Sequence, residues 1–507
     1  MKDKYFLSLT IPYVNATPHI GYALECIQGD VMARYQRFCG KDVFFLSGTD
    51  ENSLKNVQAA EKAGMSVQDF VKLHAAEFYK LKDTLNLTWD DFIRTTEDRH
   101  SKGAQSLWNA CAQDIYKKKY SGLYCVGCEA FYDVDELDNG KCPEHKTPLE
   151  QVDEENYFFA LSKYQKQIEE ALKENLIRII PESRKNEMLA FVQRGLQDFS
   201  ISRSTERAHG WGVAVPGDDT QIMYVWFDAL SNYINGLNFG GDKKLYEQFW
   251  LQSDQEKREV VHILGKGVAK FHLLYWIGML LSAKISLPTA EFIHGYITVN
   301  GEKMSKSIGN VVAPQAVISK YGKEASRYYF LAAISSYQDG DYSEERFEEI
   351  YTSHLVNGIG NLTSRILTMV EKYSDSKVPA VAPDVFDTKG FWEKYHESMN
   401  NFAFHEIIQL IQSLVSACDV TINETKPWDK FAHGESISNL LYQLTETLRH
   451  IALSIVPILP ETANGILVRL GSDIRALKEL SVEQEWGRID PGTKVVKGDI
   501  LFARIKK

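Results

Sequence analysis

The chain has 507 residues, of which 44% are hydrophobic and 25% charged, and its formal net charge is −11. This length predicts two or more domains, and the composition excludes a disordered chain. The negative charge argues against a protein that binds nucleic acid over its whole surface, although a local basic face is compatible with it. No apolar run approaches the ~20 residues of a membrane-spanning helix. The N-terminus resembles neither a signal nor a transit peptide, so a cytoplasmic protein is expected.

The N-terminal segment has the pattern of a βαβ unit. Residues 5–11 are β-branched and aromatic, as in a buried strand. Apolar residues then recur at helical spacing from Ile20 to Phe38, and Gly40 stands where a helix end favours glycine. A second buried strand is expected over 43–46. This order predicts an α/β fold with a Rossmann-type parallel sheet and a right-handed crossover.

The rest of the chain predicts an insertion followed by a helical region. Clustered cysteines and a turn-rich acidic loop interrupt the α/β pattern from about 114 to 222. The pattern resumes with a strand over 260–264 and a helix over 268–282. From about 341, amphipathic helices are expected near 344–373, 391–422 and 435–457, and a strand-like coda, 494–505, is expected to pack back on the body. The predicted segments are an α/β domain in two halves (1–113 and 223–300), an inserted domain (114–222), a loop with linking helices (301–357) and an all-α bundle (358–507).

Two segments far apart in the chain carry a nucleotide-binding pattern. Pro18-His19-Ile20-Gly21 lies in the turn before the first helix, where backbone N–H groups can bind phosphate and glycine permits close approach. Lys303-Met304-Ser305-Lys306-Ser307 places two lysines three residues apart, which can neutralise a departing pyrophosphate. Either segment alone could be a chance helix start or a solvated basic loop. Together, each at the expected edge of an α/β unit, they predict an ATP-using enzyme.

The two segments resemble the HIGH and KMSKS signatures of class I aminoacyl-tRNA synthetases. The short sequence motifs around them resemble those of the methionyl family over almost the whole chain. These motifs are Ile11-Pro12-Tyr13-Val14-Asn15, Gly48-Thr49-Asp50-Glu51, Tyr224-Val225-Trp226-Phe227-Asp228-Ala229, Phe271-His272 and His294-Gly295-Tyr296. The resemblance implies an enzyme that activates L-methionine with ATP and Mg²⁺, releases pyrophosphate and esterifies the 3′ end of tRNA(Met). Catalysis would consist of positioning and charge stabilisation, without a protein nucleophile.

The resemblance also implies the residues of the site. ATP would contact Pro18, His19, Gly21, Tyr22, Gly265, Lys266, Lys303, Met304, Ser305, Lys306 and Ser307, and His19, Gly21, Lys303 and Lys306 would be catalytic. The methionine side chain would contact an apolar, polarizable lining of Ile11, Tyr13, Trp226, Leu230, Tyr233 and His272. Asp50 would accept hydrogen bonds from the α-ammonium. Trp226 and Tyr233, seven residues apart on a predicted helix, could instead form a core stripe.

Several positions depart from the family pattern. Tyr22 replaces the second histidine of the first signature, so a cationic contact to phosphate is lost, although the phenol could still donate a hydrogen bond. Gly267 stands where an acidic residue often contacts the ribose. Asn52-Ser53 stands in place of His-Gly, and Leu230 in place of proline. Phosphate binding is therefore expected to depend more on His19, the helix start and the two lysines.

Three of the seven cysteines cluster in the insertion and predict a metal site. Cys125 and Cys128 form one knuckle, and Cys142 and His145 form a second, 13 residues further on. Four such ligands match tetrahedral zinc with no open position, so a structural site is favoured over a catalytic one. Free thiols in a loop are the weaker alternative. The resemblance likewise implies one structural zinc.

Three residues of the helical region lie in motifs that resemble the anticodon-contacting motifs of the family. Asn361 and Arg365 lie four apart on one helix face, and Trp428 follows a proline. Single-stranded bases are recognised by stacking on aromatic rings and by hydrogen bonds to their edges, although Trp428 could also be bundle core and Arg365 part of a surface ion pair. The insertion is too short for a large editing domain, and the absence of an appended C-terminal module favours a monomer. The alternatives are another class I synthetase, such as the cysteinyl type, and a zinc-containing tRNA-binding protein without catalysis.

Overall fold

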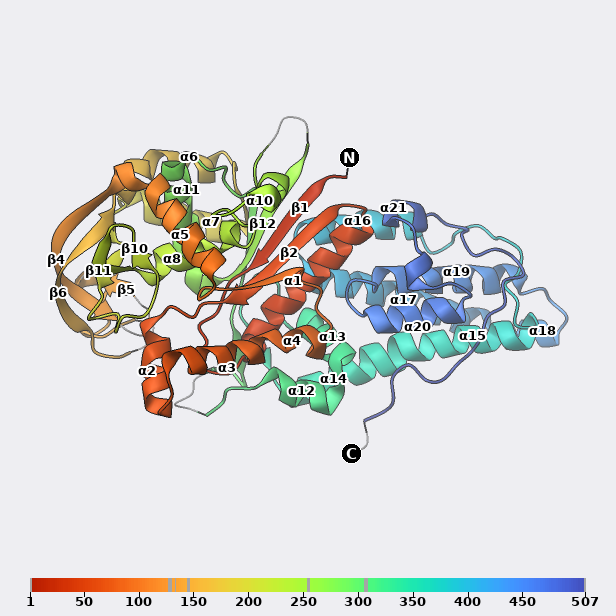
Figure 1. The fold of residues 1–507 in the computed structure, drawn as a ribbon. Coiled ribbons are helices and arrows are strands. Elements are labelled where there is room, and N and C mark those ends of the chain that lie inside the picture. Colours follow the sequence, from red (N-terminus) through yellow and green to blue (C-terminus); the bar gives the residue numbers. More distant parts are fainter. Residues whose placement is uncertain are drawn as a thin grey trace.

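The structure is a computed structural model that describes residues 2–125, 130–132, 134–143, 146–252, 256–304 and 309–505. The molecule is elongated (Figure 1). A central sheet lies in its middle, a small inserted sheet lies at one end, and a helical bundle forms the other end.

Six parallel strands form the central sheet, in the order β3-β2-β1-β12-β13-β7. The predicted parallel α/β sheet is therefore confirmed. From β1 the chain builds outward through β2 to β3, and it later builds in the other direction from β12 to β13. The strand order consequently reverses between β1 and β12, which is where such sheets bind ligands, at the carboxyl ends of the strands. The strands are β1 (Lys4–Leu9), β2 (Asp42–Thr49), β3 (Asp91–Arg94), β7 (Arg178–Ile180), β12 (Arg258–Gly265) and β13 (Ala290–His294).

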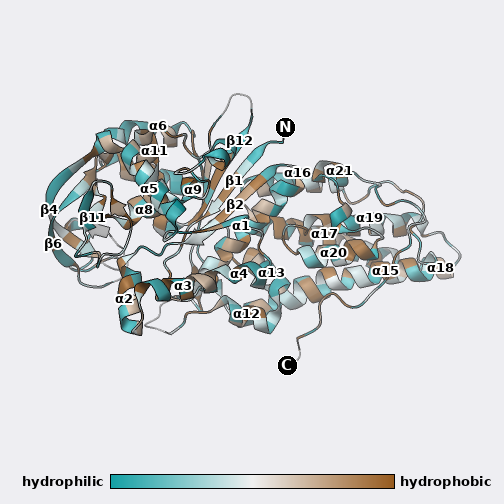
Figure 2. Ribbon diagram, in the orientation of Figure 1, coloured by the Kyte–Doolittle hydropathy of each residue, from teal (hydrophilic) through white to brown (hydrophobic). Residues whose placement is uncertain are grey.

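The edge strand β7 comes from the range that the sequence assigned to the insertion. It pairs with β13 in the central sheet. The separate four-stranded sheet, ordered β5-β4-β6-β8, forms the body of the insertion. Its long strands β4 and β6 are hydrophilic, in contrast to the hydrophobic β1 and β2 (Figure 2). The smaller strands are β4 (Ile115–Cys125), β5 (Ala130–Tyr132), β6 (Glu150–Phe159), β8 (Phe199–Ser200), β9 (Ser202–Ser204), β10 (Ala214–Val215), β11 (Asp218–Met223), β14 (Ile297–Val299), β15 (Glu302–Lys303) and β16 (Gly340–Tyr342).

Helix α1 (Ile20–Phe38) packs directly on β1 and β2, with nearly every residue buried. Gly29 makes this approach possible, because a Cβ there would lie 2.6 Å from Leu9 and 2.9 Å from Phe45. Helices on the other face cover the residues of β1 and β12 that point away from α1. The remaining helices of the first 285 residues are α2 (Leu54–Ala63), α3 (Val67–Tyr79), α4 (Leu81–Thr84), α5 (Asp98–Ala110), α6 (Gln165–Lys173), α7 (Glu182–Gln193), α8 (Val225–Leu230), α9 (Asn232–Asn235), α10 (Lys244–Phe249) and α11 (Ile277–Ala283).

The helix predicted over 268–282 is present, but its first part is not an α-helix. Residues Phe271–Trp276 form a π-helical turn that continues into α11. Isolated π-turns inside helices are frequent at functional sites. This one carries His272, a residue predicted to contact the substrate.

The prediction that the C-terminal region is helical is confirmed, with two corrections. The segment 391–422 is not one helix, because the chain turns at 401–403, where Phe402 adopts a φ of 55°. The coda is not a strand: of residues 494–505, Lys494 alone forms a bridge, to Lys377. The coda does pack back as expected, since Tyr351 donates a hydrogen bond to the Ala503 carbonyl. The helices are α12 (Pro314–Tyr321), α13 (Lys323–Ala333), α14 (Glu344–Ile350), α15 (Asn361–Tyr373), α16 (Thr388–Asn400), α17 (Phe404–Thr425), α18 (Pro427–Ala432), α19 (Ser438–Ser454), α20 (Pro460–Arg469) and α21 (Leu480–Glu483), with a π-helical segment over Tyr351–Gly360.

A fully buried arginine joins the α/β part to the bundle. Arg327 on α13 forms an ion pair with Asp30 on α1, with 2.8 Å between Nη2 and Oδ2. Its guanidinium also donates to the carbonyls of Leu85, Pro457 and Ile458, at 3.0, 2.9 and 2.8 Å. A buried charge needs such complete pairing to be tolerated. Within the described ranges, no helix is both long enough and apolar enough to cross a membrane.

Candidate active site

The two predicted ATP segments meet at the carboxyl ends of the central strands. Met304 Cε lies 3.6 Å from the position that a Cβ on Gly21 would take. The carbonyl of Val312, at the far end of the same loop, accepts a hydrogen bond from Ile20 N at 3.0 Å. Segments almost three hundred residues apart in the sequence are therefore in contact. Ser305, Lys306 and Ser307 lie outside the described residues.

His19 occupies the N-cap position of α1. Its Nδ1 accepts a hydrogen bond from Gly21 N at 3.0 Å, so the ring proton is on Nε2. The ring folds back so closely that a Cβ on Gly21 would lie 2.9 Å from it. Because Val312 and His19 already take the first two helical N–H groups, phosphate binding at this helix start requires these internal bonds to be exchanged for bonds to the ligand.

Tyr22 does not face the helix start. Its phenol is buried and lies 3.1 Å from Ser47 Oγ, and its ring makes an edge-to-face contact with Phe78. Burial raises its pKa well above the usual value. The hydrogen bond to phosphate that we considered for this phenol is thus not what the structure shows, because the large ring is accommodated in the core between α1 and β2.

Tyr233 and His272 form a buried pair on the face of the sheet opposite α1. The hydroxyl of Tyr233 lies 2.5 Å from His272 Nε2, and His272 Nδ1 lies 2.9 Å from the Val268 carbonyl. A carbonyl only accepts, so Nδ1 carries the proton and Nε2 accepts from Tyr233. Burial lowers the pKa of His272 to about 4, which keeps the ring neutral. The two aromatic side chains thus form a buried and uncharged hydrogen-bonded pair.

Trp226 and Leu230 lie beside this pair. Trp226 stacks on Phe271, with ring centroids 3.7 Å apart, and its Nε1 is buried without a hydrogen-bond partner in the described part of the chain. Leu230 is buried in the same core as Tyr233. Trp226 and Tyr233 lie on separate short helices, α8 and α9, rather than on one continuous stripe. Ile11, Tyr13 and Trp226 all pack against one small cluster that includes Tyr124 of the inserted sheet.

Asp50 is buried at the end of β2, next to Tyr13. Its Oδ1 accepts a hydrogen bond from Asn52 N at 3.2 Å. The Asn52 side chain also donates to Asp228 on α8 at 2.8 Å, and Asp228 lies 2.6 Å from His100 Nε2. Asn52, one of the departures from the family pattern, therefore ties the Asp50 loop to the helix that carries Trp226.

One buried residue at these strand ends, Glu25, escaped the sequence analysis. Glu25 on α1 accepts from Thr10 N and Thr10 Oγ1, at 2.8 and 2.5 Å, and lies 3.0 Å from His294 Nε2. These contacts connect the ends of β1 and β13 across the switch point. A charged residue among the apolar residues of the first helix was the signal that could have found Glu25.

The lysines of the predicted ATP site gather around one ring. Lys266 Nζ and Lys303 Nζ lie 4.7 and 5.3 Å from the centroid of the Tyr296 ring. Lys266 also forms an ion pair with Asp339 at 2.7 Å. Burial would raise the pKa of Asp339, but the hydrogen bond from Lys266 outweighs it and the pKa is lowered. Lys303 directly precedes Met304, which lies against Gly21, so its positive charge belongs to the segment that meets the helix start.

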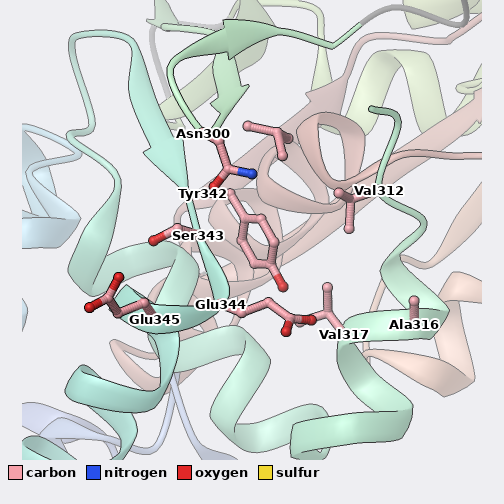
Figure 3. Close-up of a pocket in the computed structure, with 9 residues that line it drawn as sticks. Asn300, Val312, Ala316, Val317, Tyr342, Ser343, Glu344 and Glu345 are labelled. Atoms are coloured by element: carbon pink, nitrogen blue, oxygen red, sulfur yellow. The ribbon is translucent and has the colours of Figure 1, made fainter. Parts of the chain in front are cut away.

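A cavity of about 490 Å³ lies at the base of the loop that carries Lys303, away from these residues. Asn300, Tyr342 and Glu344 surround it (Figure 3). Its described lining contains none of the predicted ATP or methionine residues.

Cys125 and Cys142, two of the four predicted metal ligands, are both fully buried. Cys125 ends β4, and the backbone around Cys142 forms a tight turn closed by Cys142 N to Thr147 O and Lys146 N to Cys142 O. Cys128 and His145 lie outside the described residues. Among the described residues, no group of three or more potential metal ligands occurs.

The predicted anticodon residues lie on the bundle. Trp428 is 42% exposed on α18, at the end farthest from the central sheet (Figure 1). Asn361 and Arg365 lie on α15. Arg365 pairs with Asp419 and Asn423 of α17, at 2.5 and 2.8 Å. An ion pair was the alternative considered for Arg365, and the structure shows one, with Asp419; together with Asn423 it holds the guanidinium in one orientation.

Glu291 on β13 is a buried carboxyl with an unusual environment. Neither of its oxygens has a hydrogen-bond partner among the described residues, and burial raises its pKa to about 8. It is in register with His262, whose nitrogens face Ser8 Oγ and Trp276 Nε1 instead. The folded chain therefore keeps Glu291 protonated at neutral pH.

We expect Glu291→Gln to remove a loss of stability that develops between about pH 4.5 and pH 8. Unfolding releases the Glu291 proton between the unfolded value of 4.5 and the folded value of about 8. Its contribution is therefore complete below about pH 4.5 and is lost as the pH rises through 8, by on the order of 4 kcal/mol. Denaturant unfolding at pH 5 and pH 8 measures the effect. Glu182→Gln, an exposed control, should leave the difference between the two pH values unchanged.

Comparisons with known proteins agree with this arrangement. The family model described as tRNA synthetases class I (M) matches residues 5–153 and 144–367. The methionine–tRNA ligase of Thermotoga maritima is 38% identical, over 99% of this chain and 80% of the relative. That of Rhizobium meliloti is 38% identical, over 99% and 98%. The structure of Mycobacterium tuberculosis methionyl-tRNA synthetase in complex with methionyl-adenylate has a TM-score of 0.92 at 35% identity, covering 99% of this chain and 100% of that one.

Proposed function

The chain belongs to the methionine–tRNA ligase family of class I tRNA synthetases, and on that premise we propose how its site makes methionyl-adenylate and charges tRNA(Met). The carboxylate of methionine attacks the α-phosphorus of ATP, and the bond from this phosphorus to the pyrophosphate oxygen breaks. A ribose hydroxyl at the tRNA 3′ end then attacks the activated carbonyl, and AMP leaves.

The observation that carries the proposal is the contact between the two ATP segments beside the buried Asp50 and the Tyr233–His272 pair. Asp50 faces the methionine ammonium, and a buried carboxylate suits this charge-assisted hydrogen bond. Tyr13, Trp226, Leu230, Tyr233 and His272, with Ile11, receive the thioether side chain. Because His272 is neutral, no charge is buried against the sulfur.

The phosphates are assigned to the start of α1 and to the lysines. The Nε2–H of His19 donates to the α- or β-phosphate, and the α1 N–H groups exchange their internal partners for phosphate oxygens. Lys303 and Lys306 stabilise the charge that develops on pyrophosphate, and Lys266 contacts ATP at the end of β12. Pro18, Gly21 and Gly265 allow the nucleotide to approach the backbone, and Met304, Ser305 and Ser307 belong to the loop that covers it. Mg²⁺ bound to ATP supplies further neutralisation of the phosphates.

Methionine-dependent exchange of pyrophosphate into ATP tests this function. We expect exchange with methionine and about 100-fold less with cysteine or leucine, since an apolar pocket separates related side chains by about 10- to 200-fold. Exchange that prefers cysteine would assign the chain to another synthetase. Binding of tRNA without any exchange would indicate a protein that has lost catalysis.

We also propose one structural zinc in the inserted domain. Cys125 and Cys142 fit this role, because both thiols are buried and Cys142 lies at a turn closed by backbone hydrogen bonds, as a knuckle ligand does. Cys128 and His145 complete the donor set. The ion would fix the tip of the inserted sheet next to Tyr124, which packs in the cluster shared with Tyr13 and Trp226.

We expect the purified chain to contain one zinc and Cys142→Ser to contain none. A thiolate is the strongest ligand type of the set, and a hydroxyl does not replace it. Metal analysis by mass spectrometry measures the stoichiometry. Cys111→Ser is the control and should retain the ion, because this buried thiol faces the Met279 carbonyl, at 3.5 Å, and is not one of the proposed ligands. Equal zinc in both variants would contradict the assignment.

The bundle is proposed to recognise the anticodon. Asn361, Arg365 and Trp428 supply hydrogen-bonding groups and a stacking face, and the pairing of Arg365 with Asp419 presets its orientation. A cytoplasmic location and a monomeric state are part of the proposal and rest on the sequence alone.

We expect Trp428→Ala to lower the rate of tRNA charging about tenfold or more and to leave pyrophosphate exchange unchanged. Stacking of a base on an aromatic ring contributes about 1–3 kcal/mol, and α18 lies far from the central sheet. Val468→Ala, an exposed residue on α20, is the control. If exchange falls as much as charging, Trp428 has a structural role.

A further inference from the structure

Tyr296 stands in the connection between β13 and β14, at the sheet edge where the nucleoside of ATP is expected. If the phosphates lie at the start of α1, the nucleoside extends across the switch point, over the ends of β12 and β13. The sequence analysis assigned only Gly265 and Lys266 to these ends. Neither of them provides a side chain that can both donate and accept a hydrogen bond.

The backbone of Tyr296 is held on both sides by one segment. Its N–H donates to Asp339 Oδ1 at 2.9 Å, and its carbonyl accepts from Gly340 N at 3.0 Å. Gly295 makes this approach possible, because a Cβ there would lie 2.3 Å from the Gln338 carbonyl. The backbone position of Tyr296 is therefore set before any ligand binds.

The hydroxyl of Tyr296 fills the space left by a glycine. A Cβ on Gly267 would lie only 1.9 Å from this oxygen, and 3.1 Å from the nearest ring carbon. Gly267 directly follows Lys266 at the end of β12. Because Gly267 has no side chain, the phenol can lie at the carboxyl ends of the strands. The resemblance predicted an acidic side chain at the position of Gly267.

We propose that the Tyr296 hydroxyl binds a ribose hydroxyl of ATP, an assignment that rests on the proposed function. The ring lies within 5.3 Å of Lys303 Nζ, the phosphate-binding lysine, and the ribose is the group next to the α-phosphate. The two neighbouring ammonium groups can only donate hydrogen bonds. The phenol donates and accepts, which complements a ribose hydroxyl.

Tyr296→Phe tests the contact with three nucleotides. Pyrophosphate exchange is started with ATP, 2′-deoxyATP or 3′-deoxyATP. For the wild type we expect kcat/KM to be about tenfold lower with one of the two deoxynucleotides, the cost of one hydrogen bond. The variant should lose this preference through a raised KM for ATP, with the KM for methionine unchanged. Tyr337→Phe, whose hydroxyl donates to the Asn401 carbonyl, is the matched control and should keep the preference.

Gly267→Ala provides the second measurement. Its methyl group displaces the hydroxyl, so we expect it to lower kcat/KM for ATP about as much as Tyr296→Phe does. In the Tyr296→Phe background the closest ring carbon is 3.1 Å away, and the same change should cost little. Losses that are not additive are the signature of this shared contact.

A nucleotide preference that survives Tyr296→Phe, or losses from the two changes that simply add, would overturn the proposal. So would equal rises in KM for ATP and methionine, which indicate a structural role. These outcomes all leave methionine-dependent exchange by the wild type intact. Failure of the proposed function would instead abolish that exchange, so the two failures are distinguishable.

Discussion

Replacing Asp50 by asparagine is expected to raise the KM for methionine at least about 100-fold and to leave the KM for ATP almost unchanged. The ammonium of methionine would remain buried opposite a neutral amide, and an uncompensated buried charge costs about 3–5 kcal/mol. The amide keeps the shape of the side chain and can still accept from Asn52 N. Pyrophosphate exchange with each substrate varied in turn measures the two constants.

A methionine analogue without the amino group is the control for this prediction. It cannot use Asp50, so it should inhibit the wild type and Asp50→Asn with the same weak affinity. Weaker inhibition of the variant by this analogue would show that the substitution disturbs the pocket as a whole, and the assigned role would then fail.

Lys306→Ala is expected to slow methionyl-adenylate formation by about 100- to 1000-fold while tRNA binding stays nearly intact. Removing one donor that stabilises charge in the transition state has effects of this size. The lysine acts on the departing pyrophosphate, whereas the proposed tRNA contacts lie on the bundle. Single-turnover adenylate formation and a tRNA binding titration measure the two quantities separately.

Lys320→Ala is the matched control, because Lys320 lies on the nearby α12 and pairs with Glu344 and Glu348 at the surface. It should leave both quantities unchanged. Equal losses of adenylate formation and of tRNA binding in Lys306→Ala would contradict its assignment to the phosphates.

The sequence was sufficient for the parallel sheet, the helical region and the meeting of the two ATP segments. Each depends on a pattern repeated over many residues, such as the apolar spacing of 20–38 or the two signatures. The break at 401–403 was missed because apolar residues continue at helical spacing through it, and the backbone turn at Phe402 has no marker such as proline or glycine. The coda was misjudged because β-branched residues alone do not provide a partner strand.

The side-chain geometry of the site was harder to predict. The burial of Tyr22 against Ser47 depends on contacts between residues distant in sequence, and so does the Glu25–His294 link. The contact of the Tyr296 hydroxyl with Gly267 could not be inferred from either residue alone, since only the folded backbone brings them together. The assignments of individual residues to ATP, methionine and anticodon stay predictions until the variants are measured.

The buried Arg327 has a consequence for dissecting the protein. Two of its hydrogen bonds end on the carbonyls of Pro457 and Ile458, which follow α19 late in the chain. A fragment shortened to the sheet and its helices would keep the guanidinium but lose these acceptors, and unpaired buried charged groups cost more than 1–3 kcal/mol each. We therefore expect a fragment that ends before residue 457 to be less stable than the full chain, even though Arg327 would keep its contacts with Asp30 and the Leu85 carbonyl.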